Sequence, residues 1–138
     1  MAPYSVGLVI TNDRLKKNFR YYIKQNGALL AKGRLLGIQF LALMEDGLYY
    51  TTSREANRKA MKLKKGIADL GYSFLVDSYT NQQFPILPER IATALSEKYT
   101  FSDMGKPADG VVALRFCTNW ATKDEDVDSL LADIAMLK

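Results

Sequence analysis

The chain of 138 residues contains no histidine and a single cysteine, Cys117. Without histidine, a Ser-His-Asp triad, a Cys-His pair and the usual histidine-based zinc sites cannot be built from this chain alone, so we expect no metal site. One cysteine cannot form a disulfide within the chain, which favours a reducing compartment. Because Cys117 lies in an apolar run and has no histidine to activate it, we predict a small buried hydrophobic residue rather than a nucleophile.

Long apolar runs are also absent. No stretch approaches the roughly 20 residues of a membrane span. The N-terminal residues MAPYSVGLVITNDR have no basic region before their short apolar patch, so we expect neither an anchor nor a signal peptide. These absences predict a cytoplasmic protein with no membrane partner. Apolar residues make up 48% of the chain, which is ordinary for one globular domain.

Positive charge is distributed unevenly in a chain whose net charge is +4. Six basic residues crowd the segment Arg54–Lys65, whereas the last sixteen residues are mainly acidic. A basic stripe on a helix can bind nucleic acid. This stripe has no interleaved aromatic residues, no glycine-rich RNA-binding signature and no helix-turn-helix pattern, which favours a solvated helix face. We therefore expect no nucleic-acid partner and keep such binding as an alternative.

The segment Val111–Cys117 is predicted to be a strand with one arginine, Arg115, among apolar neighbours. Side chains alternate along a strand, so Val112, Leu114 and Phe116 share one face and Arg115 lies on the other. A buried guanidinium needs an anion, and its planar fork suits a carboxylate. Two interpretations follow: Arg115 binds a carboxylate ligand, or it lies at a strand end or edge and extends to water.

A helix is predicted after this strand. Thr122 and Glu125 have the spacing of a capping box, and acidic residues complement the positive end of the helix dipole. Trp120 is expected to pack under this helix. Apolar residues then recur with helical spacing and predict one buried stripe, formed by Val127, Leu130, Leu131, Ile134 and Leu137.

The rest of the chain predicts an α+β domain in which helices cover a small sheet. The aliphatic segment Ala28–Met44 is predicted to be a helix that ends at Glu45-Asp46-Gly47. It has so few polar positions that we expect it to lean on another domain or subunit. Pro85 predicts an edge or a bulge. The other expected elements are a strand at Val6–Ile10, helices around 15–24, over Thr51–Leu70 and after Pro88, and strands at Tyr72–Val76, Gln82–Leu87 and from Phe101. The helix over Thr51–Leu70 is predicted to stop at Gly71 and to face inward with Ala56, Ala60, Leu63, Ile67 and Leu70.

Three blocks of the chain are similar to one known family. They read YYIKQNGALLAKGRLLGIQFLALMEDGLYY, GYSFLVDSYTNQQFPILP and ALRFCTNWATKDEDVD, and they resemble the C-terminal part of the threonine aldolase and β-eliminating lyase family of pyridoxal-phosphate (PLP) enzymes. The resemblance implies a type I PLP fold like that of aspartate aminotransferase, with a mainly antiparallel sheet in the small domain. It implies that residues 1–27 end the large domain and its connecting helix, and that residues 28–138 form the small domain.

The resemblance also implies roles for single residues. In the family, the lysine that forms a Schiff base with PLP sits just before the strand matched by Val6–Ile10. No lysine precedes Lys16, so the resemblance implies no catalytic residue in this chain. Arg115 resembles the arginine that grips the substrate α-carboxylate. Arg34 resembles a basic residue near the cofactor phosphate, with a helix-surface arginine as the alternative, and Lys24 receives no role. Gln82, Gln83 and Phe84 match a family block and are expected to have a structural role.

The expected function is therefore that of a C-terminal fragment of a PLP-dependent lyase. Such enzymes cleave β-hydroxy-α-amino acids to glycine and an aldehyde, and the fragment is expected to be inactive without the cofactor-binding domain. Its expected partners are an amino-acid substrate, when completed, and either a second copy or a complementary large-domain chain. The alternatives are a non-catalytic oligomerisation module acting through Ala28–Met44, and nucleic-acid binding through Arg54–Lys65.

Overall fold

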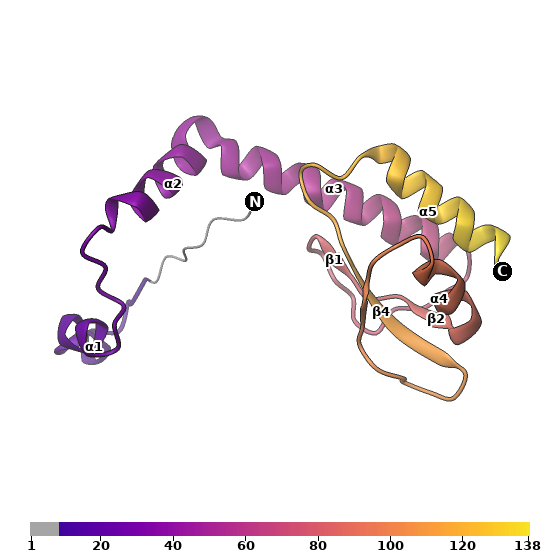
Figure 1. The fold of residues 1–138 in the computed structure, drawn as a ribbon, viewed down its shortest axis with the longest axis horizontal. Coiled ribbons are helices and arrows are strands. Elements are labelled where there is room, and N and C mark those ends of the chain that lie inside the picture. Colours follow the sequence, from indigo (N-terminus) through magenta and orange to yellow (C-terminus); the bar gives the residue numbers. More distant parts are fainter. Residues whose placement is uncertain (1–8) are drawn as a thin grey trace. The chain divides into compact units, whose positions relative to one another are not determined.

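The computed structural model describes residues 9–138, whose helices and strands are drawn in Figure 1. The chain divides into two compact units: the first unit ends at Tyr49, and the second unit runs from Tyr50 to Lys138. The strand predicted at Val6–Ile10 falls largely outside the described residues, and Val9 and Ile10 have no regular secondary structure. The domain boundary after residue 27 stays a prediction.

The first unit consists of short helices that bury no side chain. Its elements are η1 (Asp13–Leu15), α1 (Phe19–Gln25), α2 (Arg34–Met44) and η2 (Glu45–Gly47). From residue 9 to residue 49 no residue is buried, and Leu35 is 68% exposed. Residues 9–49 therefore form no hydrophobic core of their own, and apolar burial is the chief source of folding stability.

The aliphatic segment of the first unit is helical only in part. The predicted helix over Ala28–Met44 is wrong in its first six residues, because α2 begins at Arg34 after Gly33. Glycine is a poor helix former, and Gly27 (φ +69°) and Gly33 bound the non-helical part. The predicted stop at residues 45–47 is confirmed, since Asp46 and Gly47 both have positive φ angles.

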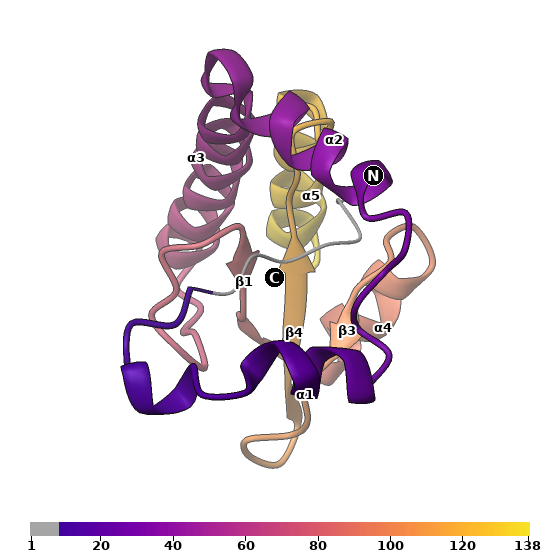
Figure 2. The ribbon, with the colours of Figure 1, turned by 90° about the vertical axis from the view of Figure 1, so that its left-hand side faces the viewer.

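The second unit contains the sheet and three further helices. They include α3 (Leu48–Asp69), which starts two residues before the unit boundary, and α5, which lies beside it (Figure 1, Figure 2). The elements after α3 are β1 (Gln82–Gln83), β2 (Ile86–Pro88), α4 (Glu89–Ser96), β3 (Ser102–Asp103), β4 (Val111–Cys117) and α5 (Asp124–Met136).

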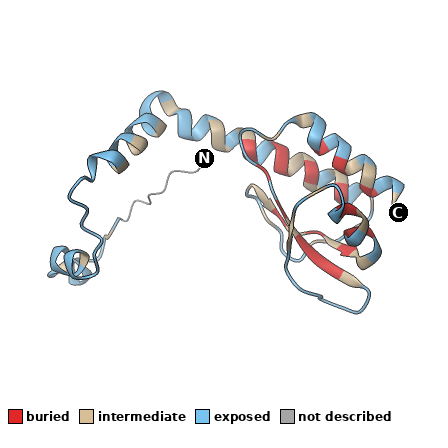
Figure 3. Ribbon diagram, in the orientation of Figure 1, coloured by how far each residue is buried: buried red, intermediate tan, exposed pale blue. Residues whose placement is uncertain are grey.

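The core lies where one face of β4 meets α3, α4 and α5. Figure 3 shows buried residues on each of these elements. The predicted inward positions of α3 and α5 are confirmed, apart from the partly buried Leu70, Leu131 and Leu137 at the margin. The core consists of Leu63, Ile67, Leu87, Ile91, Ala92, Leu95, Val112, Leu114, Phe116, Val127, Leu130 and Ile134.

Two glycines shape α3. Gly71 has a φ of +90° and directs its N–H to Ala68, while the Tyr72 N–H reaches Ile67, as in a Schellman C-cap. The helix stop predicted from Gly71 is therefore confirmed. At Gly66 a Cβ atom would come within 2.5 Å of the Leu131 side chain, so glycine lets α3 and α5 approach closely.

All strand pairs of the sheet are antiparallel and all involve β4. β1 and β2 pair with β4 in one register, from Gln82 opposite Cys117 to Pro88 opposite Val111, and β3 places Ser102 opposite Arg115. Only β4 was predicted with its exact bounds. The strand predicted at Tyr72–Val76 is wrong, because that segment contributes a single bridge, Phe74 to Pro85.

Pro85 interrupts the predicted strand Gln82–Leu87 without shifting its pairing register with β4. Two residues separate Gln83 from Ile86, and two separate their partners Ala113 and Phe116, so the predicted bulge is wrong. The Pro85 carbonyl accepts a hydrogen bond from the Leu114 N–H at 2.9 Å, but proline has no N–H to return. The missing donor explains why one line of pairing appears as two short strands.

The N-terminus of α5 is capped differently from the prediction. The N-cap is Lys123, whose N–H donates to the Asp126 carboxylate at 3.3 Å. The predicted capping box of Thr122 and Glu125 is wrong. Asn119 accounts for the difference, because its side-chain oxygen accepts from the Thr122 N–H and its own N–H donates to the Thr122 hydroxyl, which holds Thr122 in the preceding turn.

Candidate carboxylate site on the open face of the sheet

The face of β4 that points away from the helices carries the candidate site. Alternation and register place Arg115 between Ser102 on β3 and the segment that joins β1 to β2. Ala113 and Cys117 flank Arg115 along β4, opposite Ile86 and Gln82. Val112, Leu114 and Phe116 lie in the core on the opposite side of β4, which confirms the predicted separation of its two faces.

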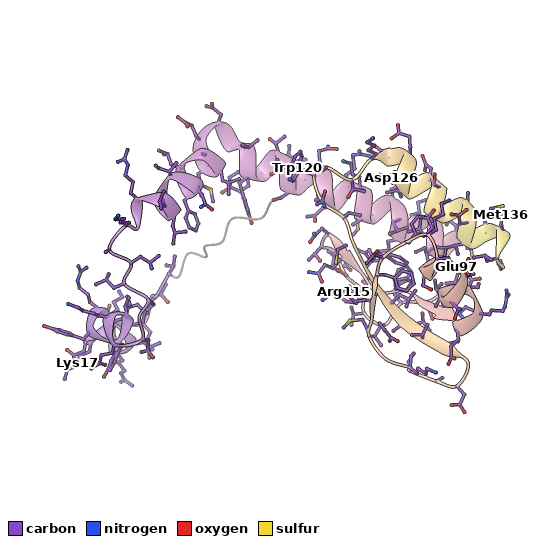
Figure 4. All side chains as sticks on the ribbon, in the orientation of Figure 1. Lys17, Glu97, Arg115, Trp120, Asp126 and Met136 are labelled. Carbon is purple, nitrogen blue, oxygen red and sulfur yellow. The ribbon has the colours of Figure 1, made fainter. Side chains whose placement is uncertain are left out.

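Arg115 lies in the middle of β4 and is partly buried (Figure 4). Its Nη2 donates a hydrogen bond to the Ser102 hydroxyl at 3.0 Å, and its Nε is buried without a hydrogen-bond partner. Within residues 9–138 the guanidinium has no ion pair. A partly desolvated cation with one neutral partner is costly, and an incoming anion would offset that cost.

The alternative of an edge-strand arginine does not match the sheet. β4 pairs with β1, β2 and β3, and the strand order places it inside the sheet, so Arg115 lies in an interior strand. Its side chain therefore rises from the middle of the face rather than from a margin. The Arg115 cation therefore faces any partner that binds on this side of the sheet.

The end of β4 is anchored by buried hydrogen bonds just beyond Arg115. The Thr118 hydroxyl donates to the Ala56 carbonyl on α3 at 2.7 Å, and the Asn81 side chain donates to the Thr118 carbonyl at 2.8 Å. Lys59, which is 7% exposed, donates to the Trp120 carbonyl at 3.2 Å. These contacts fix the strand that carries Arg115 to the longest helix.

The two arginines predicted as site residues lie in different units. Arg34 is the first residue of α2 and is exposed, and Lys24 lies exposed in the last turn of α1. Arg115 belongs to the second unit. The structure therefore gives the surroundings of Arg115 and leaves the role of Arg34 as a prediction.

Gln83 has the structural role predicted for its block. It is fully buried, and its side-chain nitrogen donates to the Thr80 carbonyl at 2.9 Å, while its Oε1 has no partner. Its register partner is Phe116, so its side chain lies on the core face, opposite to Arg115. This contact secures the turn before β1.

The basic stripe on α3 is largely engaged with acidic groups. Arg58 donates through two nitrogens to Asp124, and this pair lowers the pKa of Asp124 to about 2 and raises that of Arg58. Lys62 pairs with Asp124 and with Asp128 on α5. Lys64 pairs with Asp77 and Lys65 with Asp69. The stripe thus contributes to the contact of α3 with the acidic helix that follows β4.

Two predicted packing residues are exposed instead. Cys117 is exposed at the end of β4, and Trp120 is 61% exposed in the following turn (Figure 4). Each prediction was wrong for its own reason. Cys117 lies on the face of β4 that points away from the helices, and the turn after β4 carries Trp120 away from α5. Ser102 was missed, because its place beside Arg115 depends on strand register.

Three hollows are lined by residues around Arg14 and Tyr22, around Lys98 and Met136, and around Phe101 and Lys106, and neither Arg34 nor Arg115 lines any of them. No cluster of metal-binding side chains occurs among residues 9–138. In the same range no helix is long and apolar enough to cross a bilayer.

Curated relatives of the chain are threonine aldolases. It is 31% identical over 132 residues to a low specificity L-threonine aldolase of a Pseudomonas species, covering 92% of this chain and 36% of that protein. It is 30% identical to the corresponding Pseudomonas aeruginosa protein, covering 94% of this chain and 37% of the relative. The chain thus spans little more than a third of the length of these relatives. No protein-family profile matches it.

Two solved structures are also similar to this chain. Leishmania major threonine aldolase superposes with a TM-score of 0.85 at 38% identity, covering 93% of this chain and 37% of that one. Sphingomonas wittichii serine palmitoyltransferase superposes with a TM-score of 0.50 at 20% identity, covering 60% of this chain and 23% of that one, and shows a shared fold alone. The predicted fold, an α+β small domain of the type I PLP architecture, is confirmed.

Proposed function

Because the chain is homologous to a C-terminal portion of the threonine aldolase family, we propose that it forms the small domain of a PLP-dependent lyase. Its substrate would be a β-hydroxy-α-amino acid, cleaved to glycine and an aldehyde. The observation that carries the proposal is Arg115, an interior-strand guanidinium whose described polar contact is one neutral hydroxyl. Its role would be to bind the α-carboxylate through paired hydrogen bonds.

In this proposal the cofactor is held by the part of the family that this chain does not match. When bound, PLP supplies the electron sink for bond cleavage at the α-carbon. Arg115 would hold the substrate in one orientation, which contributes to rate as well as to affinity. Arg34 would contact the cofactor phosphate, as its place in the family block suggests. The single cysteine supports a cytoplasmic location.

The first unit would pack against another domain or a second subunit. Residues 1–49 carry seven basic and three acidic side chains, whereas residues 50–138 carry twelve of each, so the net charge of +4 belongs to the first unit. Its exposed apolar residues include Leu35, Ile38 and Leu41. Such a surface is typical of an interface. The second candidate function is therefore a non-catalytic oligomerisation module.

We propose no nucleic-acid partner for the basic stripe. Arg58, Lys62, Lys64 and Lys65 have carboxylate partners within the chain, and an ion-paired cation gains less from a phosphate. Retention of the chain on duplex or single-stranded DNA at low salt would contradict this part of the proposal.

A hybrid enzyme tests the proposed function. The chain would replace the matching C-terminal portion of the Pseudomonas aeruginosa threonine aldolase, and threonine cleavage would be followed as acetaldehyde release. We expect cleavage by the hybrid. Arg115→Ala should lower kcat/KM by about 10-fold to 100-fold, the value of a charged hydrogen bond, and Arg115→Lys should recover only part of it.

The hybrid also separates the two candidate functions. A hybrid that folds, binds PLP and cleaves threonine equally well with Arg115→Ala would contradict the carboxylate role. A folded hybrid without any cleavage, together with a stable dimer of the chain alone, would favour the oligomerisation module. Arg90→Ala is a matched control, because Arg90 binds backbone carbonyls of residues 137 and 138, far along the chain from β4.

A further inference from the structure

Among residues 9–138, Ser102 is the one residue whose polar group contacts the Arg115 guanidinium. The two residues are register partners on β3 and β4, so their side chains rise on the same face of the sheet. The Ser102 hydroxyl accepts from Nη2 at 3.0 Å, and the remaining buried donor, Nε, has no partner. The plane of the guanidinium is therefore held by a single side chain.

The chemical nature of this partner matters. A carboxylate at residue 102 would form an ion pair and use up the positive charge, whereas a hydroxyl accepts one hydrogen bond and leaves the charge in place. The nearest carboxylate on β3 is Asp103, which faces Leu114 on the other side of the sheet. Its oxygen accepts from the Gly105 N–H at 2.7 Å and so closes the turn after β3.

We infer that Ser102 is a positioning residue that orients Arg115 for a carboxylate ligand without neutralising it. The inference rests on the proposed function, because it assigns Ser102 a part in the same binding event. A fixed guanidinium binds a carboxylate more tightly than a mobile one, since less side-chain entropy is lost on binding. Ser102 thus acts on affinity through Arg115 and has no contact with the reacting atoms.

The inference predicts different results for three substitutions. Ser102→Ala removes the hydrogen bond that orients Arg115 and should weaken carboxylate binding by about threefold to tenfold, because Ser102 acts on the ligand only through Arg115. Ser102→Thr keeps the hydroxyl and should restore binding. Ser102→Asp should keep Arg115 ordered through an ion pair, yet abolish carboxylate binding. Ser96→Ala is the control, because the Ser96 hydroxyl binds the Thr93 carbonyl within α4.

The test is nitrogen-15 NMR of the arginine side chains in the full chain, with the Arg115 signals assigned by their loss in Arg115→Lys. The first measurement needs no ligand. Slow rotation about the Nε–Cζ bond is expected for the wild type, Ser102→Thr and Ser102→Asp, and fast rotation for Ser102→Ala. Equal rotation in wild type and Ser102→Ala would overturn the positioning role, whatever the ligand does.

The second measurement is a titration with acetate, the simplest carboxylate probe. We expect the Arg115 signals of the wild type and of Ser102→Thr to shift, with a weaker response in Ser102→Ala and none in Ser102→Asp. If the wild type does not respond although its rotation is slow, the proposed carboxylate function fails while the Ser102 contact stands. An equal response in wild type and Ser102→Asp would overturn the inference.

Discussion

The two units of this chain show opposite ways of using apolar residues. The second unit buries its aliphatic side chains against β4, carries equal numbers of acidic and basic residues, and pairs many of these charges across its surface. The first unit leaves most of its described aliphatic side chains exposed and holds the net charge of +4. The second unit therefore has a hydrophobic core of its own, whereas residues 9–49 of the first unit have none.

This comparison predicts that the same substitution has unequal effects in the two units. Leu63→Ala in the core of the second unit should cost about 2–5 kcal/mol, because it removes buried contacts and leaves a cavity. Leu35→Ala on exposed α2 should change the free energy of unfolding of the chain by less than about 0.5 kcal/mol. Urea unfolding of both variants measures the difference. Equal losses of unfolding free energy would contradict the difference between the two units.

A smaller loss is expected where the second unit buries a polar contact. Thr118→Val keeps the shape of the side chain but removes the donor to the Ala56 carbonyl. The unsatisfied carbonyl should cost about 1–3 kcal/mol of unfolding free energy. The matched control is Thr93→Val, whose exposed hydroxyl donates to the Glu89 carbonyl within α4. A loss as small as that of the control would show that the anchor of β4 contributes little.

Acid should act on the second unit through Asp124. Its pKa in the folded state is lowered from 3.8 to about 2, chiefly by its hydrogen bonds with Arg58. A lowered pKa stabilises the fold above pH 3.8, and this contribution disappears as the pH falls from about 4 to about 2. Asp124→Asn should therefore flatten the pH dependence of stability below pH 4. An unchanged acid-unfolding curve would contradict the contribution of this pair.

The smallest effect is expected for an exposed ion pair on α3. Lys65 and Asp69 are both largely solvent-exposed. Lys65→Ala should change the unfolding free energy by no more than about 0.5 kcal/mol, because solvent screens such pairs. Urea unfolding at physiological salt measures the change. A larger loss would mean that exposed ion pairs contribute more to the stability of the second unit than expected.

The sequence predicted elements whose patterns are local. The alternation of β4 and the stripes of α3 and α5 were visible because one face of each meets the core, and Gly71 marked the end of α3 by its conformation alone. Predictions failed where a neighbouring residue competed, as Asn119 does for Thr122 and as Pro85 does within its strand. The outcome of such competition depends on the backbone conformation of the turn or strand, which the sequence does not show.

The candidate site was predictable in its charged residue and not in its surroundings. A lone arginine in an apolar strand left two interpretations open, a carboxylate ligand or a strand-end or edge arginine, and the family resemblance implied the first, which stays a prediction. Ser102 carried no local signal, because its contact arises from antiparallel register between strands separated by a long turn. The exposure of Cys117 was missed because the sequence does not show how far that face of β4 is covered: Ala113 is buried on it, whereas Cys117 is exposed.

The most direct test of the carboxylate role compares two ligands of the PLP-bound hybrid enzyme, glycine and glycinamide, which differ in the charge that Arg115 is proposed to bind. The hybrid should bind glycine more tightly than glycinamide, and Arg115→Ala should lower that preference by about tenfold or more. An unchanged preference in Arg115→Ala would show that another residue binds the carboxylate and would contradict the account.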